Sequence, residues 1–526
     1  MVVSITTKKP EDNRAEVFLG AGEHDETSLH LRVDQLLGNF CLRINGGMNT
    51  GGNWRKRQAR ERELYRIGLR LERKWEDSTT SLDLGLSMGE GLIYSSIGPT
   101  WIRDLYKGHA MLSHQAERWR AHVSFSQLYQ EFFFDMPLIY NQVELGRVDT
   151  WSSMAPNSLD VEGQLNWPLF EGNLLIVGAG YRWLSYVSDD NDPPEVYQHR
   201  LSAFFQDEQK LWDQLTVTGG VRCDYNSITP FTVSPRLALV WRYKRNQSAR
   251  VAVGRAFRKP SFFNTSFHLT TAVGTSAFPG LGDFVKENVG NDYLGNESVT
   301  TIEAGYRGYF FEGALEVESD VFFNMYRDTI FFLSEVRYNT MGLPDLSLSR
   351  MRWDNGGREV NTIGGTLSLT YKIKKTLRLN ANYTYRYSWY ISEPPGGASM
   401  GEEPKGERVS WEPAHLLNVA GTWVSEDGPR LGASIFARSE VTHAFPYDGG
   451  LFSEVHKFRN PPNMVLNAFL AWRVNLGDGW AEAGVRVYNL FNAGYRDIAS
   501  VYRWDGFAMG GELSARRIFL FLRASI

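Results

Sequence analysis

The chain has 526 residues, a formal net charge of -4 and a mean hydropathy of -0.34. This charge gives no reason to expect a nucleic-acid partner, and no apolar run approaches the ~18 residues that a membrane helix needs. The chain is therefore either water-soluble or a transmembrane β-barrel, whose strands leave only a weak hydropathy signal.

Segments that alternate apolar and polar residues recur along the chain. Residues 215–225, 367–373 and 377–385 carry their apolar residues at odd positions and most of their polar residues at even positions. Successive side chains of a strand point to opposite faces, so each segment has one apolar and one polar face. Many such strands predict a sheet closed around a polar interior, with the odd positions of 377–385 facing lipid. The residues expected to face the lumen there are Arg378, Asn380, Asn382 and Thr384.

Short and long connections alternate between these strands. The short connections contain Gly, Asn or Asp, as tight hairpins require; they are 36–39, 74–77, 170–173, 244–247, 311–313, 425–429 and 475–479. The long connections are 89–108, 132–156, 259–298, 388–411, 445–460 and 492–510. We therefore expect an all-β fold, a transmembrane antiparallel β-barrel of about 22 strands with short periplasmic turns and long extracellular loops.

Two alternatives use the same strands differently. A soluble β-sandwich or propeller that binds carbohydrate would bury the apolar faces in its core. A barrel without an internal domain would be a passive outer-membrane pore. No linker rich in Ser, Pro or Gly divides the chain, which favours a single domain.

Aromatic and basic residues of the long connections are the candidate ligand-binding residues. Aromatic side chains offer rigid faces to organic ligands such as iron chelates, sugars or corrinoid rings, although a membrane-interface belt would use the same residue types. Two arginines could hold an anionic ligand or pair with acids of the lumen. The candidates are Trp101, Tyr106, Phe267, Trp389, Trp411, Trp504, Arg255 and Arg258.

Residues for catalysis or for a cofactor are not recognisable. The ten histidines are scattered, and His109 and His114 make no convincing metal pair. Gly178–Gly180 and Gly364–Gly365 fall within strands, so they are not phosphate-binding loops. We expect no enzyme activity, no bound metal and no cofactor.

Several segments, in order, resemble TonB-dependent outer-membrane receptors. The resemblance covers a strand pair with a Phe-Gln-acidic signature and a late Asn-Leu-Phe run followed by Tyr. The segments are 198–225, 234–240, 250–262, 296–298, 301–307, 485–495 and 516–520.

The resemblance implies a domain organisation and a function. Residues 1–14 are similar to the last strand and linker of the plug that fills such barrels, and 15–526 correspond to the barrel. The remainder of the plug and a signal peptide are then expected upstream. The implied function is energised uptake, in the outer membrane of a Gram-negative-type bacterium, of a bulky scarce solute such as a siderophore, cobalamin or a saccharide.

The implied partners are outer-membrane lipid, the plug, the TonB energy complex acting through the plug, and a small-molecule or chelate ligand; no nucleic acid is expected. One feature departs from the family. Its barrels usually end in an aromatic residue, whereas this chain ends in Ile526. Ile526 is in phase with Leu520 and Leu522, so we expect it on the apolar face.

Overall fold

The computed structural model describes residues 12–52, 62–95, 98–140, 143–273, 284–338, 344–374, 376–393, 404–448, 453–493, 495–496, 501–502, 508–509, 513–514 and 516–526. Most of the segment expected to be the plug remnant lies outside these residues, so that prediction stays untested. The strand expected to follow it is β1 (Arg14–Gly22).

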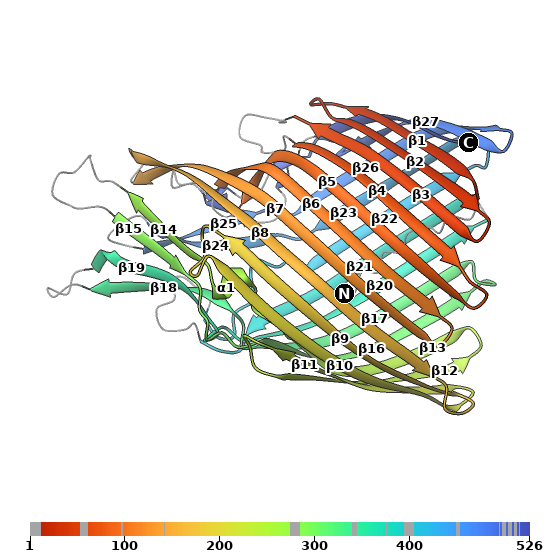
Figure 1. The fold of residues 1–526 in the computed structure, drawn as a ribbon, viewed down its shortest axis with the longest axis horizontal. Helices are drawn as coiled ribbons and strands as arrows, with labels where there is room; N and C mark the ends of the chain where they lie inside the picture. The colour runs from red at the N-terminus through yellow and green to blue at the C-terminus, as the bar shows by residue number, and fades with distance from the viewer. Residues whose placement is uncertain are drawn as a thin grey trace.

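Twenty-two strands form one closed antiparallel sheet, a cylinder whose strands are tilted to its axis in Figure 1. Each strand pairs with the next one around the cylinder, and the last pairs with the first. In this order the strands are β1, β2 (Thr27–Leu37), β3 (Phe40–Gly51), β4 (Arg62–Lys74), β5 (Ser78–Ser95), β6 (Gly98–Ala116), β7 (Trp119–Tyr140), β8 (Val143–Trp167), β9 (Asn173–Ser188), β10 (Glu195–Trp212), β11 (Leu215–Asn226), β12 (Thr232–Lys244), β13 (Gln247–Arg258), β16 (Glu297–Phe310), β17 (Leu315–Arg327), β20 (Val360–Ile373), β21 (Leu377–Tyr390), β22 (His415–Val424), β23 (Gly428–Arg438), β26 (Asn463–Leu476), β27 (Gly479–Tyr488) and β32 (Arg517–Ser525). The predicted fold class and strand number are confirmed.

All seven predicted short connections are tight turns at one end of the barrel, which we call the short-turn end. Gly172 and Gly477 adopt φ of 80° and 64°, a region that glycine enters without strain. The opposite end, which we call the mouth, carries the remaining elements. These are the helix α1 (Phe262–Thr265) and the strands β14 (His268–Val273), β15 (Phe284–Val289), β18 (Phe331–Tyr338), β19 (Pro344–Asp354), β24 (Val441–Asp448), β25 (Ser453–Asn460), β28 (Tyr495–Arg496), β29 (Val501–Tyr502), β30 (Ala508–Met509) and β31 (Leu513–Ser514).

Two predicted long loops are instead extended hairpins. Residues 89–108 and 132–156 belong largely to β5 to β8, whose ladders continue toward the mouth. Apolar and polar residues stop alternating there, but backbone hydrogen bonds do not depend on that alternation. Among the described residues, no helix is long and apolar enough to cross a membrane.

The register of the sheet separates an outer from an inner face. Leu379, Tyr383 and Tyr385 of β21 are exposed on the outer face, and the polar residues between them point inward. Thr384, for example, lies 3.2 Å from the hydroxyl of the inner residue Thr366. The alternation predicted for 377–385 is therefore confirmed, and a sandwich with buried apolar faces is excluded.

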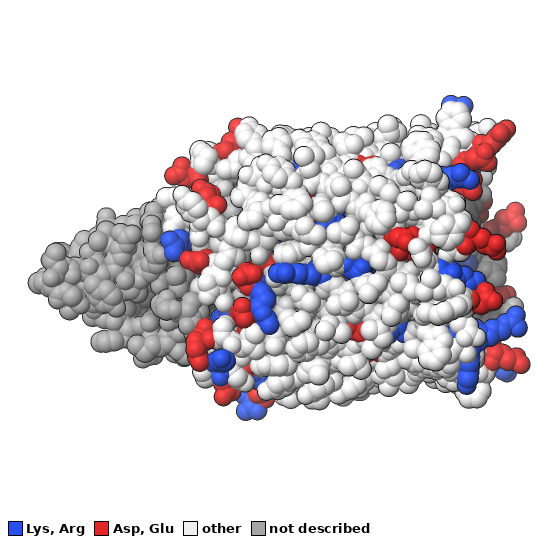
Figure 2. Space-filling view, turned by 90° about the horizontal axis from the view of Figure 1, so that it is seen from below, with Lys and Arg blue, Asp and Glu red and all other residues white. Residues whose placement is uncertain are grey.

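The outer face has the pattern of a membrane-embedded surface. Figure 2 shows charged side chains crowded at both ends, with a mostly uncharged middle that contains a few basic side chains. Exposed tryptophans follow the short-turn end, as expected for a girdle at a membrane interface; they are Trp75, Trp119, Trp167, Trp212, Trp241 and Trp472.

The barrel closes where β1 pairs with β32. Ala15 and Ile526 exchange backbone hydrogen bonds of 2.8 and 2.9 Å. Ile526 is exposed, as are Leu520 and Leu522 on the outer face, which confirms its predicted phase. On the inner face of this seam, Phe519 and Phe521 stack near Phe18 and form, with Ala471, a small buried apolar cluster.

Candidate functional site

The inner wall of the barrel is lined by ion pairs, some within one strand and some between strands. Arg250 lies 3.1 Å from Glu303 and 2.7 Å from Asp320, and Arg222 lies 3.1 Å from Asp224. None of these pairs places a nucleophile beside a general base. In the described part of the chain, no group of His, Cys, Asp and Glu could hold a metal ion. The wall therefore has the character of a polar conduit.

An aromatic cluster stands at the mouth, above this conduit. Tyr186, on the inner face of β9, stacks on Phe262 of α1 with ring centroids 5.6 Å apart. Phe263 lies 4.4 Å from Phe267 and 5.8 Å from Trp353. We call these five residues the mouth cluster. Because Tyr186 points inward, its stacking partner Phe262 lies on the bore side of the wall, and Phe263 follows it in α1.

Local chemistry fixes the mouth cluster in place. Lys259-Pro260 ends β13, and the Asn264 side chain accepts hydrogen bonds from the backbone and hydroxyl of Ser261, which caps α1. The segment that follows α1 is bound to the turn after β9, because the backbone N–H of His268 donates to the carbonyl of Asp190 over 2.6 Å.

Two charged groups beside the mouth cluster are partly removed from water. Burial raises the pKa of Asp190, and the neighbouring Asp189 adds to this, while a hydrogen bond from Ser152 opposes it. Burial lowers the pKa of Lys259, which lies 3.9 Å from Asp224. Arg258 pairs with Glu297, whose other oxygen accepts the N–H of Ile330 over 2.6 Å.

Four of the predicted site residues lie on the outer face of the barrel. Tyr106 pairs with Met88 and is 48% exposed, and Trp101 pairs with Leu92 on the same face. Trp389 is in phase with Tyr385 and Tyr387 on β21. Arg255 is in phase with Val251 and Val253, and donates to Ser298 over 3.3 Å. These are positions where an interfacial belt is expected.

The other predicted residues have different positions. Phe267 belongs to the mouth cluster, and Arg258 lies on the inner face at the end of β13. Trp411 is 53% exposed in the connection between β21 and β22. Trp504 lies outside the described residues. The structure therefore places both Phe267 and Arg258 at the mouth, whereas Trp101, Tyr106, Trp389 and Arg255 lie on the outer face.

Four members of the mouth cluster were not singled out from the sequence alone as candidates for binding: Tyr186, Phe262, Phe263 and Trp353. Tyr186 occupies an even position of its strand, as the inner residues Arg182 and Leu184 do, so the alternation could have predicted that it faces inward. Trp353 lies at the end of β19, in the four-stranded sheet of β14, β15, β18 and β19 at the mouth. No alternation of apolar and polar residues predicts how these strands pair.

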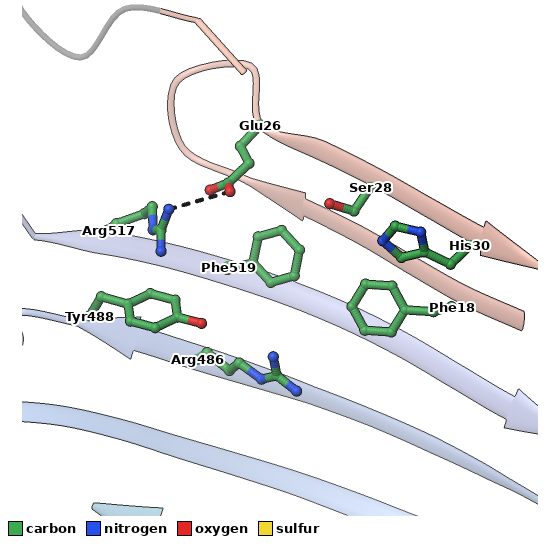
Figure 3. A pocket seen from close by; sticks show the side chains of 8 residues that line it. All are labelled: Phe18, Glu26, Ser28, His30, Arg486, Tyr488, Arg517 and Phe519. Carbon is green, nitrogen blue, oxygen red and sulfur yellow. Dashed lines mark hydrogen bonds and ion pairs between the residues drawn. The ribbon is translucent and has the colours of Figure 1, made fainter. Parts of the chain in front are cut away.

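A second inner feature is a pocket at the seam, shown in Figure 3. Its volume is about 310 Å³. The rings of Phe18, Phe519 and Tyr488 line it, and Glu26 reaches toward Arg517 across its upper rim, 3.3 Å away. The remaining lining residues are Ser28, His30 and Arg486.

Residues 37–490 match a family model described as the TonB-dependent receptor-like β-barrel. The chain belongs to this family. TonB-dependent receptors are transporters of the outer membrane of Gram-negative bacteria and not enzymes, as predicted. The short turns of this TonB-dependent receptor barrel therefore face the periplasm, and its mouth faces the exterior.

The chain is also similar to individual receptors. It is 25% identical over 242 residues to the ferrienterobactin receptor of Escherichia coli K12, a match that spans 46% of this chain and 30% of the relative. A mutant ferric enterobactin receptor of Pseudomonas aeruginosa has a TM-score of 0.74 at 17% identity, covering 99% of this chain and 81% of that one. The siderophore receptor PirA of Acinetobacter baumannii has a TM-score of 0.71 at 15% identity, with coverages of 99% and 81%.

Proposed function

We propose that this chain is the barrel of an energised importer that captures a ferric siderophore at its mouth. The mouth cluster is the observation that carries the proposal. It offers ring faces from β9, α1 and β19 at the mouth, where a captured solute would enter. Aromatic faces bind large flat or chelated organic ligands through broad apolar contact.

Two further observations support this function. The relatives named above are receptors for ferric enterobactin or for a siderophore, and siderophores are bulky organic chelates. The inner wall carries many ion pairs and hydroxyl groups, which suit contact with a plug domain or with a polar solute. Uptake would then require a plug and the TonB energy complex, as family membership implies.

The first test is ligand binding by the purified chain in detergent. We expect ferric siderophores to quench tryptophan fluorescence saturably, and cobalamin and oligosaccharides to have no effect. The double variant Phe263→Ala, Phe267→Ala removes two ring faces and should weaken binding by at least about tenfold, since each buried aromatic contact contributes ~1 kcal/mol or more. Tyr387→Ala, on the outer face, is the matched control.

If cobalamin or a saccharide quenches saturably and ferric siderophores do not, the proposed ligand is wrong and that compound takes its place. Equal affinity of the double variant and the Tyr387→Ala control would remove the mouth cluster from the binding site. Uptake of radioactive iron into cells that carry the complete receptor should stop when the proton-motive force is dissipated. Continued uptake would favour the passive pore instead.

A further inference from the structure

The pocket at the seam is assembled from opposite ends of the sequence. Phe18 comes from β1, Ser28 and His30 from β2, Tyr488 and Arg486 from β27, and Phe519 from β32. These strands are consecutive neighbours in the closed sheet. The pocket opens on the inner wall, and its volume of about 310 Å³ lies at the lower end of the range of small-molecule sites.

Toward the periplasmic end, the inner wall beside the seam is electrically balanced. Asp34 is 2% exposed and accepts hydrogen bonds from Arg32 and Arg43. Glu72 is 1% exposed and lies 3.0 Å from Arg70, and Glu482 pairs with Arg430. Each of these four arginines therefore has a carboxylate partner, whereas Arg473, opposite Glu482, lies over the ring of Trp480. These pairs give no reason to expect a bound anion.

The level of the pocket has an excess of positive charge. Arg62 and Arg517 share one carboxylate, that of Glu26, at 3.4 and 3.3 Å. Arg486 and Arg66 have no carboxylate partner among the described residues: Arg66 lies 3.1 Å from His30, and Arg486 contacts only a ring face. Four guanidinium groups thus belong to the pocket or contact its lining, and only two of them contact its one carboxylate, that of Glu26; a second acid, Glu23, accepts the backbone N–H of Ile518.

Aromatic rings hold two of these arginines at the pocket. Arg517 lies over Tyr488 at 4.2 Å, and Arg486 lies over Phe521 at 4.6 Å. A guanidinium group stacked on a ring keeps its N–H edge available for a carboxylate or phenolate oxygen. The rings of Phe18, Phe519 and Tyr488 provide apolar surface beside that edge, as Figure 3 shows.

We propose that this pocket binds a flat organic anion, namely a carboxylate or ionised phenol attached to an aromatic ring. Arg486 binds the charged group, with Arg66 adding positive potential, and the phenylalanine rings contact the ring of the ligand. The assignment of this ligand to the transported solute rests on the proposed function: the pocket would be a binding point on the inner wall, below the mouth cluster. Binding by the pocket does not itself depend on that assignment.

The test uses the full chain in detergent micelles and 4-fluorobenzoate as the probe, observed by fluorine NMR. We expect saturable line broadening with the acid and none with 4-fluorobenzamide, its neutral analogue. Arg486→Gln should weaken binding by about tenfold or more, and Arg486→Lys by less, because lysine keeps the charge but loses the planar fork. Arg120→Gln is the matched control, since Arg120 is a luminal arginine near a short turn and bonds to the neutral Gln164 over 2.8 Å.

A difference in gel mobility between heated and unheated samples verifies that each variant is folded. Equal binding of the acid and its amide, or unchanged binding in Arg486→Gln, would overturn the proposal. Loss of fluorobenzoate binding in Arg120→Gln, as large as in Arg486→Gln, would also overturn it. A ferric siderophore titration of the same samples separates the two proposals. Binding of the chelate without binding of fluorobenzoate would contradict the pocket alone, and binding of fluorobenzoate without the chelate would contradict the proposed function alone.

Discussion

Asp34 is a buried carboxylate of the inner wall near the periplasm. Its carboxylate is buried between Arg32 and Arg43. Asp34→Ala leaves both guanidinium groups without their counter-charge, so we expect the free energy of unfolding to fall by about 3–5 kcal/mol. The midpoint of urea unfolding in micelles, followed by tryptophan fluorescence, measures this loss.

The control is an ion pair in a more exposed setting. Glu318 has a side chain that is 41% exposed and lies 2.9 Å from Arg307. Its replacement by alanine should lower the free energy of unfolding by less than about 1 kcal/mol, because water screens the pair. If the two variants lose the same stability, burial of Asp34 is not what makes its pairs important.

Single residues also show how far a sequence pattern can place a site. Trp389 and Arg255 continue the odd-position phase of Tyr385 and of Val253, so the alternation alone predicts that they face outward. Trp101 and Tyr106 differ in parity and yet share the outer face, because the ladder shifts by one residue between Arg103 and Tyr106. No sequence period reveals such a β-bulge.

Strands of the inner wall contain glycines that are covered by an aromatic ring of the next strand. Gly178 of β9 faces Phe204 of β10, and a Cβ at Gly178 would lie 2.2 Å from the Phe204 ring. Gly178→Ala should therefore push the ring into the bore and lower the free energy of unfolding by about 1–3 kcal/mol. Urea unfolding tests this, and adding Phe204→Ala should remove the clash with the ring and leave only the closer approach to the Gly163 carbonyl oxygen, at 2.9 Å.

The matched control lies on the neighbouring strand, on the other face. A Cβ at Gly163 of β8 would meet nothing within 4 Å. Gly163→Ala should leave stability unchanged or raise it by up to about 1 kcal/mol, since alanine restricts the unfolded chain. A larger loss in Gly163→Ala than in Gly178→Ala would mean that the ring contact is not decisive.

At the level of whole elements, the sequence predicts hairpins well and the mouth poorly. The turns at 244–247 and 475–479 are recognisable because tight turns demand particular residues. The mouth cluster depends on stacking between β9, α1 and β19, and on the backbone bond from His268 to Asp190. These contacts join segments far apart in the chain, and their residue types occur equally in an interfacial belt.

For the molecule as a whole, the decisive property is which face of the cylinder meets lipid. Leu84 of β5 is exposed between Leu69 and Ala110 of the neighbouring strands. Leu84→Arg should lower the free energy of unfolding in lipid vesicles by about 2–4 kcal/mol, as for cations near the middle of a bilayer.

Ser87→Arg, on the inner wall of the same strand, tests whether position and not charge causes this loss. Its guanidinium group enters the aqueous bore opposite Arg66 and Lys107. Water screens the repulsion between these like charges, so we expect a loss of less than about 1 kcal/mol in the same vesicles. A larger loss for Ser87→Arg than for Leu84→Arg would contradict the assignment of the two faces.

The seam sets the order in which this molecule can assemble. Every other ladder of the barrel joins strands that are near neighbours along the described chain, whereas β1 must wait for β32, almost 500 residues later. Contacts so remote in sequence form slowly. Until they form, β1 and β32 each present a free edge that could pair with a strand of another molecule. We therefore expect these two edges to be shielded while the chain assembles, and occupancy of the seam pocket would report that closure is complete.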